Sequence, residues 1–454
     1  MTSRDPKSGQ QTRSVAAAAM GNATEWFDYG VYAAAATYIT AAFFPGELGT
    51  LGTMLGFAVS FVLRPLGGMV WGPLGDRIGR KAVLATTILL MAAATGAIGL
   101  LPSHATAGVF APIMLILLRV VQGFSTGGEY GGAATYLAES CNDRRRGFLG
   151  SFLEFGTLGG FVGGSAVVLA CQLALGSDAM HEWGWRIPFL MAVPLGLIGW
   201  YLRSRLEESA VFTEVQEQEH PKTGLRVLVT EYKRELLTLG GLVVALNIVN
   251  YTLLTYQPTY LQDTIGVGES TTTTMMLIGQ VIMMLALPFF GRLSDSVGRR
   301  PMWLFSLIGL GILAIPMYML MGQGTGWAVL GFVVLGLFYI PQLSTITATF
   351  PAIFPTHVRY AGFALGYNVS TAIFGGTAPL VNDAVIRATG WSLFPAFYMV
   401  FACVIGLIAL RFLRETVGAS LRGTDVPITD EIPAIAKPTP PPVIGGATAT
   451  ITKP

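Results

Sequence analysis

Two carboxylates, Glu25 and Asp28, stand in the middle of an apolar stretch that runs from Val15 to Phe44. On a helix, these two acids share one face with Tyr29 and Tyr32, because the four residues follow i, i+3, i+4, i+7 spacing. A charge at the centre of a bilayer costs ~3 kcal/mol even on the most lenient scale, so this face is expected to line a polar cavity. Protonation removes that cost, and a buried carboxylate that exchanges protons is what a proton-coupled carrier needs.

A second polar face is expected on the apolar stretch 108–138, which contains Arg119 and Glu129. We predict an ion pair between Asp28 and Arg119 that breaks when Asp28 takes a proton. Glu25 and Glu129 would then extend the proton path. The alternative is a static pair that only fixes helix packing, and buried ion pairs are weak evidence for stability.

The whole chain has the composition of a polytopic membrane protein. Of its 454 residues, 52% are hydrophobic and only 12% are charged, whereas soluble proteins carry roughly 25% charged residues. Stretches of about 20 apolar residues can cross a bilayer as helices. Twelve such spans are predicted, at 15–43, 50–72, 82–101, 108–138, 148–175, 187–204, 236–261, 271–291, 301–321, 326–349, 360–388 and 391–412.

The positions of the basic residues predict the orientation of these spans. With the N-terminus inside, 24 of the 28 Lys and Arg residues fall in cytoplasmic segments or at the cytoplasmic ends of spans. The polar segment 1–14 is followed by no small-residue cleavage pattern, so it is expected to be a retained tail and not a signal peptide. We therefore expect a multi-pass protein of the cell inner membrane with both termini in the cytoplasm.

One short motif occurs twice. GPLGDRIGRK at 72–81 aligns with GRLSDSVGRR at 291–300, and Asp76 matches Asp295. This repeat predicts an all-α membrane protein of twelve transmembrane helices in two six-helix halves, an arrangement in which carriers place their site between the halves. The expected segments are a tail at 1–14, a first half at 15–204, a central loop at 205–235, a second half at 236–413 and a tail at 414–454.

The duplicated motif resembles the signature of the major facilitator superfamily. Other stretches, including GNATEWFDYGVY, RVVQGFSTGGEYGGAATYLAE and FPTHVRYAGFALGYN, resemble its metabolite:proton symporter branch. Within that branch, LLTYQPTYL and RETVGASLRGT are most similar to members that carry proline and glycine betaine. The resemblance implies transport by alternating access. It does not extend to the coiled coil of some osmosensing members, because the Pro- and Thr-rich tail from Gly423 has no heptads and is expected to be disordered.

The motif residues are expected to act in conformational gating. The motif aspartate can accept hydrogen bonds at a helix N-terminus, while the motif arginines hold the opposite half. Glu154, beside the sequence RRRGF, is expected to form a gate salt bridge. The predicted gating set is Gly72, Asp76, Arg77, Gly79, Arg80, Asp295, Gly298, Arg299, Arg300 and Glu154.

Substrate contacts are expected from both halves. The rings of Trp26, Tyr29 and Tyr32 can hold a quaternary ammonium by cation–π attraction. Arg64 is predicted either to meet a substrate carboxylate or to reach the membrane surface and brace the Asp76 loop. The predicted spans of the second half carry amides and phenols in place of deep charges, and the candidates there are Asn247, Asn250, Tyr251, Gln280, Tyr367 and Asn368.

Together these features predict proton symport of a small zwitterionic osmolyte or amino acid. One alternative is proton symport of an organic acid such as 2-oxoglutarate, citrate or shikimate, and another is a non-transporting sensor on a carrier scaffold. No enzyme motif, cofactor cradle or metal-ligand spacing is recognised in the sequence. The expected partners are the substrate, protons and the bilayer, with no nucleic acid, and the expected state is a monomer or a weak oligomer.

Overall fold

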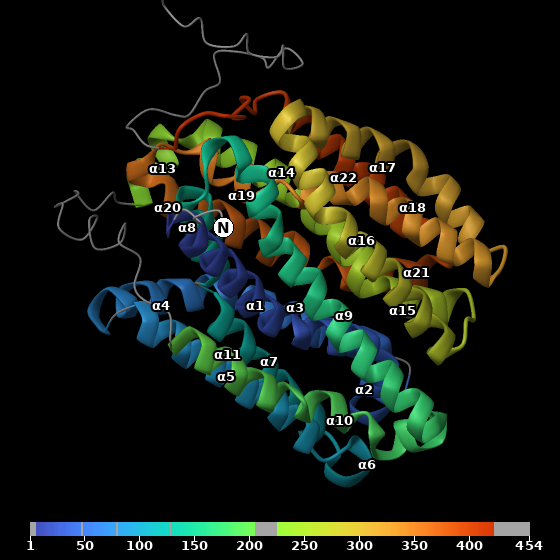
Figure 1. Ribbon diagram of the computed structural model, residues 1–454. Helices are drawn as coiled ribbons and strands as arrows, with labels where there is room; N and C mark the ends of the chain where they lie inside the picture. The colour runs from blue at the N-terminus through green and yellow to red at the C-terminus, as the bar shows by residue number, and fades with distance from the viewer. Residues whose placement is uncertain (1–5, 47–48, 79, 128, 205–224, 422–454) are drawn as a thin grey trace, which may run out of the picture.

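The computed structural model describes residues 6–46, 49–78, 80–127, 129–204 and 225–421, and this part of the chain is built from helices and short turns (Figure 1). The helices of the first half are α1 (Pro6–Ala34), α2 (Ala36–Phe43), α3 (Gly49–Val62), α4 (Arg64–Ile78), α5 (Arg80–Leu100), α6 (His104–Ala107), α7 (Phe110–Thr126), α8 (Glu129–Ser140), η1 (Asp143–Arg145), α9 (Arg146–Ala179), η2 (Met180–Gly184), α10 (Arg186–Leu190) and α11 (Ala192–Ser204).

The second half is also built from helices. Its helices are α13 (Leu225–Glu231), α14 (Lys233–Tyr251), η3 (Thr252–Tyr256), α15 (Gln257–Thr259), η4 (Tyr260–Thr264), α16 (Glu269–Val297), α17 (Arg299–Met321), α18 (Thr325–Leu343), α19 (Ile346–Thr349), η5 (Pro351–Ile353), α20 (Thr356–Ser370), η6 (Thr371–Gly375), α21 (Ala378–Thr389) and α22 (Phe394–Leu410).

The described helices account for the twelve predicted spans. Eight helical stretches are long and apolar enough to cross a bilayer, and three shorter apolar helices lie among them. The remaining crossing is α1 followed by α2, which carries the two acids noted in the sequence.

Several spans are interrupted at polar positions. α3 ends at Val62 and α4 begins at Arg64, immediately before Pro65. A proline has no backbone N–H and disturbs the preceding turn, which explains the break. In the second half, π-helical turns flank Gln257 and Pro258.

The long helix α9 lies between the two halves and packs against α1 on one side and α16 on the other (Figure 1). Gly156, Gly160 and Gly164 recur every four residues on α9, and a Cβ at any of them would meet the α1 backbone. Small residues at this spacing let two membrane helices approach closely. They therefore fix α1, and with it both acids, against α9.

The halves meet at both ends of the bundle. We call the end that holds the second copy of the motif, 291–300, the motif end, and the opposite end, where α2 and η4 approach the start of α16, the far end. The candidate site lies between them.

Candidate transport site

The buried carboxylate of Asp28 has a complete set of polar partners. Nη1 of Arg119 lies 2.8 Å from its Oδ2, and Nε2 of Gln122 donates to its Oδ1 at 2.9 Å. Gln122 also accepts from Arg119 at 2.7 Å and donates to the hydroxyl of Thr95 at 2.7 Å. The structure thus contains the Asp28–Arg119 contact that the sequence predicts, and the role of this contact in proton coupling stays a prediction.

Arg119 is covered by an aromatic ring. Its guanidinium carbon lies 3.8 Å from the ring centroid of Tyr32, and the arginine is fully buried. The Tyr32 hydroxyl donates to the backbone oxygen of Thr53 at 2.8 Å, which fixes the ring. The charge of Arg119 is therefore balanced at short range by one carboxylate and one ring, while its Nε and Nη2 have no hydrogen-bond partner among the described residues.

Arg64 is a second buried arginine, and its charge is matched less closely. Its Nη2 donates to the Tyr29 hydroxyl at 2.8 Å and lies 3.9 Å from Oε1 of Glu25. Its Nε has no hydrogen-bond partner among the described residues. Arg64 is only 2% exposed, which contradicts the second of its two predicted roles, in which it reaches the membrane surface. The break before Pro65 instead places it beside α1.

Aromatic rings surround the Arg64 region and join the two halves. Trp26 and Tyr251 are stacked with their centroids 6.4 Å apart. Tyr251 also packs against Phe61 at 5.0 Å and Phe57 at 5.8 Å, and the Arg64 guanidinium lies 4.2 Å from the Phe61 centroid. Because Tyr251 belongs to the second half and the other rings to the first, this cluster spans the interface.

Two of the predicted amides of the second half bind neighbouring helices of their own half. Asn247 donates to the Thr371 hydroxyl at 2.8 Å, and Asn250 accepts from the Tyr339 hydroxyl at 2.8 Å. These bonds satisfy one polar atom of each amide and leave the second available to a ligand.

Two other amides connect the halves. Gln280 accepts from Ser165 at 3.1 Å, and Asn368 donates to the backbone oxygen of Gly127 at 3.3 Å. Their partners belong to the first half, so both amides lie at the interface where a substrate is expected.

Glu154 does not form the predicted gate salt bridge. It is 2% exposed, and its Oε1 accepts from the Tyr130 hydroxyl at 2.5 Å. Among the described residues, no basic side chain forms an ion pair with it. The Tyr130 ring is stacked on Tyr367 of the second half at 4.8 Å. The prediction is wrong because α9 carries Glu154 about two turns inward from the basic loop, to a position among neutral groups.

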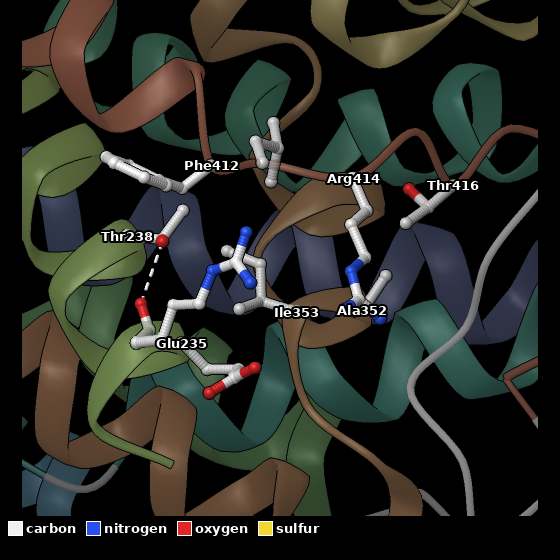
Figure 2. Close-up of a pocket in the computed structure, with 9 residues that line it drawn as sticks. Glu235, Thr238, Ala352, Ile353, Phe412, Arg414 and Thr416 are labelled. Carbon is white, nitrogen blue, oxygen red and sulfur yellow. Dashed lines mark hydrogen bonds between the residues drawn. The ribbon is translucent and has the colours of Figure 1, made fainter.

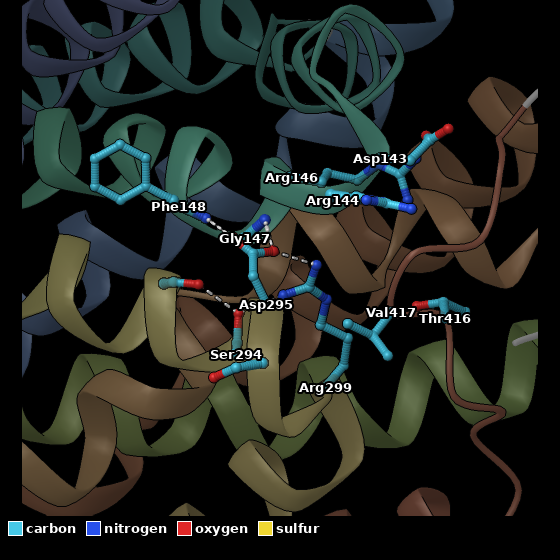
Figure 3. A network of polar contacts seen from close by, with 12 residues as sticks. Asp143, Arg144, Arg146, Gly147, Phe148, Ser294, Asp295, Arg299, Thr416 and Val417 are labelled. Carbon is cyan, nitrogen blue, oxygen red and sulfur yellow. Dashed lines mark hydrogen bonds and ion pairs between the residues drawn. The ribbon is translucent and has the colours of Figure 1, made fainter. Parts of the chain in front are cut away.

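The motif end is closed by a carboxylate that caps a helix (Figure 3). Asp295 accepts from the backbone N–H of Gly147 at 2.8 Å and of Phe148 at 2.9 Å, at the first turn of α9 in the opposite half. A negative charge at a helix N-terminus is favourable because unpaired N–H groups and the helix dipole point toward it. This is the contact that the sequence predicts for the motif aspartate.

The motif arginines, in contrast, form their hydrogen bonds within their own half. Arg299 donates to Asp295 at 2.8 Å and also to Ser294. The backbone N–H groups of Arg299 and Arg300 donate to the carboxylate of Glu415, at 2.9 and 3.0 Å. Gly298 turns the chain between α16 and α17 at a φ of 106°, a region that favours glycine. The Arg299 side chain thus forms its hydrogen bonds within its own half, although its guanidinium packs against Gly147 of the first half. The role of these arginines in holding the other half stays a prediction.

Further contacts at the motif end were not predicted. Arg359 of the second half, which is 1% exposed, donates to Glu139 of the first half at 2.8 Å. Arg146 donates to the backbone oxygen of Ala419 at 3.1 and 3.2 Å. Arg359 stands in FPTHVRYAGFALGYN and Arg146 in RRRGF, each just before a predicted span. A basic residue at such a boundary was the feature of the sequence from which these contacts could have been predicted.

The far end is closed by a separate set of hydrogen bonds. Glu269, the first residue of α16, accepts from the Tyr38 hydroxyl at 2.7 Å and contacts Nε2 of His181 at 2.8 Å. The Thr50 hydroxyl donates to Asp263 at 3.1 Å. Each of these bonds joins the first half to the second, so the described contacts close the bundle at both ends.

One buried acid of the second half was also missed. Asp383 on α21 is 3% exposed and pairs with Arg387 at 2.8 Å, and Arg387 lies 3.9 Å from Asp263. Its i, i+4 spacing to Arg387 in NDAVIRATG was a recognisable signal of an ion pair within a helix.

Some predicted site residues are not tested by these contacts. The side chain of Glu129 lies outside the described residues, as do those of the first motif copy. The predicted members of that copy are Gly72, Asp76, Arg77, Gly79 and Arg80.

A cavity near the motif end of the second half is too small to be the substrate site. It lies between the start of α14 and the chain after α22 and is lined by residues that include Arg234, Thr238 and Arg414 (Figure 2). Its volume of about 20 Å³ accommodates about one water molecule. The polar interface between the halves remains the candidate site.

The sequence is similar to those of known transporters. The family model described as "Major Facilitator Superfamily" matches residues 18–379. The chain is 39% identical to the "Proline/betaine transporter" of Salmonella typhimurium, covering 93% of this chain and 87% of that protein. It is 41% identical to the "Ectoine/proline transporter ProP" of Corynebacterium glutamicum, covering 89% and 84% respectively.

The fold is shared with a solved carrier. The structure of the proton:xylose symporter XylE bound to 6-bromo-6-deoxy-D-glucose superposes with a TM-score of 0.72 at 17% identity, covering 91% of this chain and 98% of that one. The twelve helices in two halves, the helix-capping motif aspartate and the match over residues 18–379 all lead to one conclusion. This chain is a multi-pass membrane protein that belongs to the Major Facilitator Superfamily of transporters.

Proposed function

We propose that this protein is a proton symporter of a small zwitterion, such as proline or glycine betaine, and that it works by alternating access. The observation that carries the proposal is the 39% and 41% identity, over most of both chains, to relatives named for proline, betaine and ectoine. These relatives favour a zwitterion over 2-oxoglutarate, citrate or shikimate. Membership of a transporter family favours a carrier over a sensor.

The two charges of a zwitterion have complementary partners in the candidate site. We assign the substrate carboxylate to Arg64, whose nearest carboxylate oxygen is 3.9 Å away and whose Nε is unpaired among the described residues. We assign the ammonium to the rings of Trp26 and Tyr251, which attract cations through their π faces. These rings belong to opposite halves, so closing the halves brings both of them onto the ammonium.

Proton coupling is assigned to Asp28 and Arg119. A proton on Asp28 removes the charge that balances Arg119 at 2.8 Å, so that Arg119 is released to take another partner. Glu25 and Glu129 would extend the path of the proton. The other proposed substrate contacts are Tyr29, Tyr32, Asn247, Asn250, Gln280, Tyr367 and Asn368.

The distribution of basic residues supports a location and an orientation in the membrane. Because 24 of the 28 basic residues lie on one predicted side, we propose the cell inner membrane, with the motif end and both termini in the cytoplasm. A monomer or weak oligomer is proposed, since the polar interface lies between the halves of one chain.

The test is uptake of radiolabelled glycine betaine and proline into proteoliposomes with an inward proton gradient, in parallel with 2-oxoglutarate and citrate. We expect accumulation of the zwitterions that an uncoupler abolishes. Accumulation of an organic acid without flux of either zwitterion would overturn the substrate assignment and retain the carrier.

A further inference from the structure

Glu154 differs from the other buried acids in its surroundings. Asp28 is paired with Arg119 at 2.8 Å, and Glu25 lies 3.9 Å from Arg64. Glu154 is just as buried, but it accepts a hydrogen bond from the phenol of Tyr130 and forms no ion pair among the described residues. Burying an ionised carboxylate without a cation costs free energy. The carboxylate avoids this cost either by binding a proton or by becoming exposed to water.

Among the described residues, the hydrogen-bonding groups beside Glu154 are neutral. Tyr130 comes from α8, and Thr157 lies one turn further along α9, where its hydroxyl accepts from Asn22 of α1 at 2.6 Å. From the second half, the ring of Tyr367 on α20 is stacked on Tyr130 at 4.8 Å. The buried charges of the neighbouring aromatic cluster, Glu25 and Arg64, lie 3.9 Å from one another and so partly balance each other.

Glu154 also lies where opening of the motif end would reach it. Tyr130, its hydrogen-bond donor, is stacked on Tyr367 of the opposite half at 4.8 Å. Glu154 is about two helical turns from the α9 N-terminus, which Asp295 caps. Separation of the halves at the motif end parts the two rings and exposes the carboxylate to water.

We propose that Glu154 is a proton-binding residue of the transport cycle that controls the motif end. With a proton, Glu154 is neutral and the closed motif end is stable. Without it, a charge is left among neutral groups, and opening the motif end relieves that cost by admitting water. The proton is therefore released on the side to which the motif end opens. This inference rests on the proposed proton symport, and it adds a second acid to Asp28.

The opening can be measured without any substrate. Spin labels at R145C of the first half and S296C of the second, both exposed, report the separation of the halves at the motif end. The native cysteines are replaced by Ser at Cys141, Cys171 and Cys403. In liposomes, we expect a longer distance to gain population as the pH rises, and we expect Glu154→Gln to abolish this change while Glu154→Asp retains it.

A control separates this effect from general loosening of the motif end. Glu139→Gln removes the ion pair with Arg359 that joins the halves. It is expected to increase the open population at every pH and to keep the pH dependence. An unchanged pH dependence in Glu154→Gln, or none in the protein with Glu154 intact, would overturn the proposal.

Transport gives the second readout. For one proton per substrate, a gradient of about one pH unit supports about tenfold accumulation of proline, and Glu154→Gln is expected to reduce it to about onefold while proline exchange continues. Absence of proline and betaine flux in the unmodified protein would refute the proposed substrate and leave the spin-label result to decide on Glu154. Full accumulation of proline by Glu154→Gln would refute the role of Glu154 and leave the proposed proton symport in place.

Discussion

Asp28 and Glu154 are both buried acids of the first half, but among the described residues only Asp28 is paired with a cation. The i, i+3, i+4 pattern around Asp28 and the basic residue on the span 108–138 predicted the Asp28–Arg119 contact, which is observed at 2.8 Å. The surroundings of Glu154 were not predictable in this way. They depend on how α8 packs against α9 and how α20 packs against α8, and packing between distant segments leaves no periodic signal in one sequence.

The role assigned to Asp28 predicts the behaviour of Asp28→Asn. The amide cannot take a proton, so it leaves Arg119 without a titratable partner. With about one pH unit of gradient, we expect proline accumulation to fall from about tenfold to about onefold, with exchange retained. Asp178→Asn, at an exposed position of α9, is the matched control and is expected to accumulate normally. Normal accumulation by Asp28→Asn would show that the Asp28–Arg119 pair is structural.

The aromatic partners of the substrate ammonium predict a loss of affinity in Tyr251→Ala. A buried cation–π contact contributes about 1–2 kcal/mol, so the Kd for glycine betaine should rise about 5- to 30-fold. Tyr251→Phe keeps the ring and should bind within about threefold of the unmodified protein. Titration calorimetry with the purified protein measures both values. Equal losses in the two variants would assign the effect to the phenol and contradict a cation–π contact.

At the scale of elements, the duplicated motif identified a helix cap but not its complete network. Asp295 accepts from the first turn of α9 as predicted, because a carboxylate at a helix N-terminus is favourable in any fold. The partners of Arg299 and Arg300 were missed, since Glu415 reaches them from beyond α22, more than 100 residues later in the chain. A local motif predicts contacts that recur in related proteins. Contacts between segments that are distant in the sequence can be identified only once the fold is known.

The cap predicts that Asp295→Asn opens the motif end. Loss of the charge weakens two backbone hydrogen bonds across the halves by about 1–2 kcal/mol in total, which raises the open population about 5- to 30-fold. The separation between spin labels at the motif end measures this shift. Asp178→Asn is the control, because Asp178 is exposed near the other end of α9 and is expected to leave the motif end unchanged. No change in Asp295→Asn would contradict a closing role for the cap.

At the scale of the whole molecule, hydropathy and the repeat predicted twelve spans in two halves, and the family match confirms this architecture. They did not predict the conformation, in which contacts join the halves at the motif end and the far end alike. Open and closed states of a carrier expose similar apolar faces to lipid, so composition cannot distinguish them. The central claim concerns the whole cycle, namely that proton and zwitterion move together.

The most direct test of that claim is proton movement driven by substrate alone. Proteoliposomes with a pH-sensitive dye inside are placed in equal pH on both sides, and glycine betaine or proline is added outside. The account predicts acidification of the interior that depends on the protein and is lost in Asp28→Asn. Entry of betaine or proline with no change of internal pH, under conditions that dissipate membrane potential, would contradict proton symport.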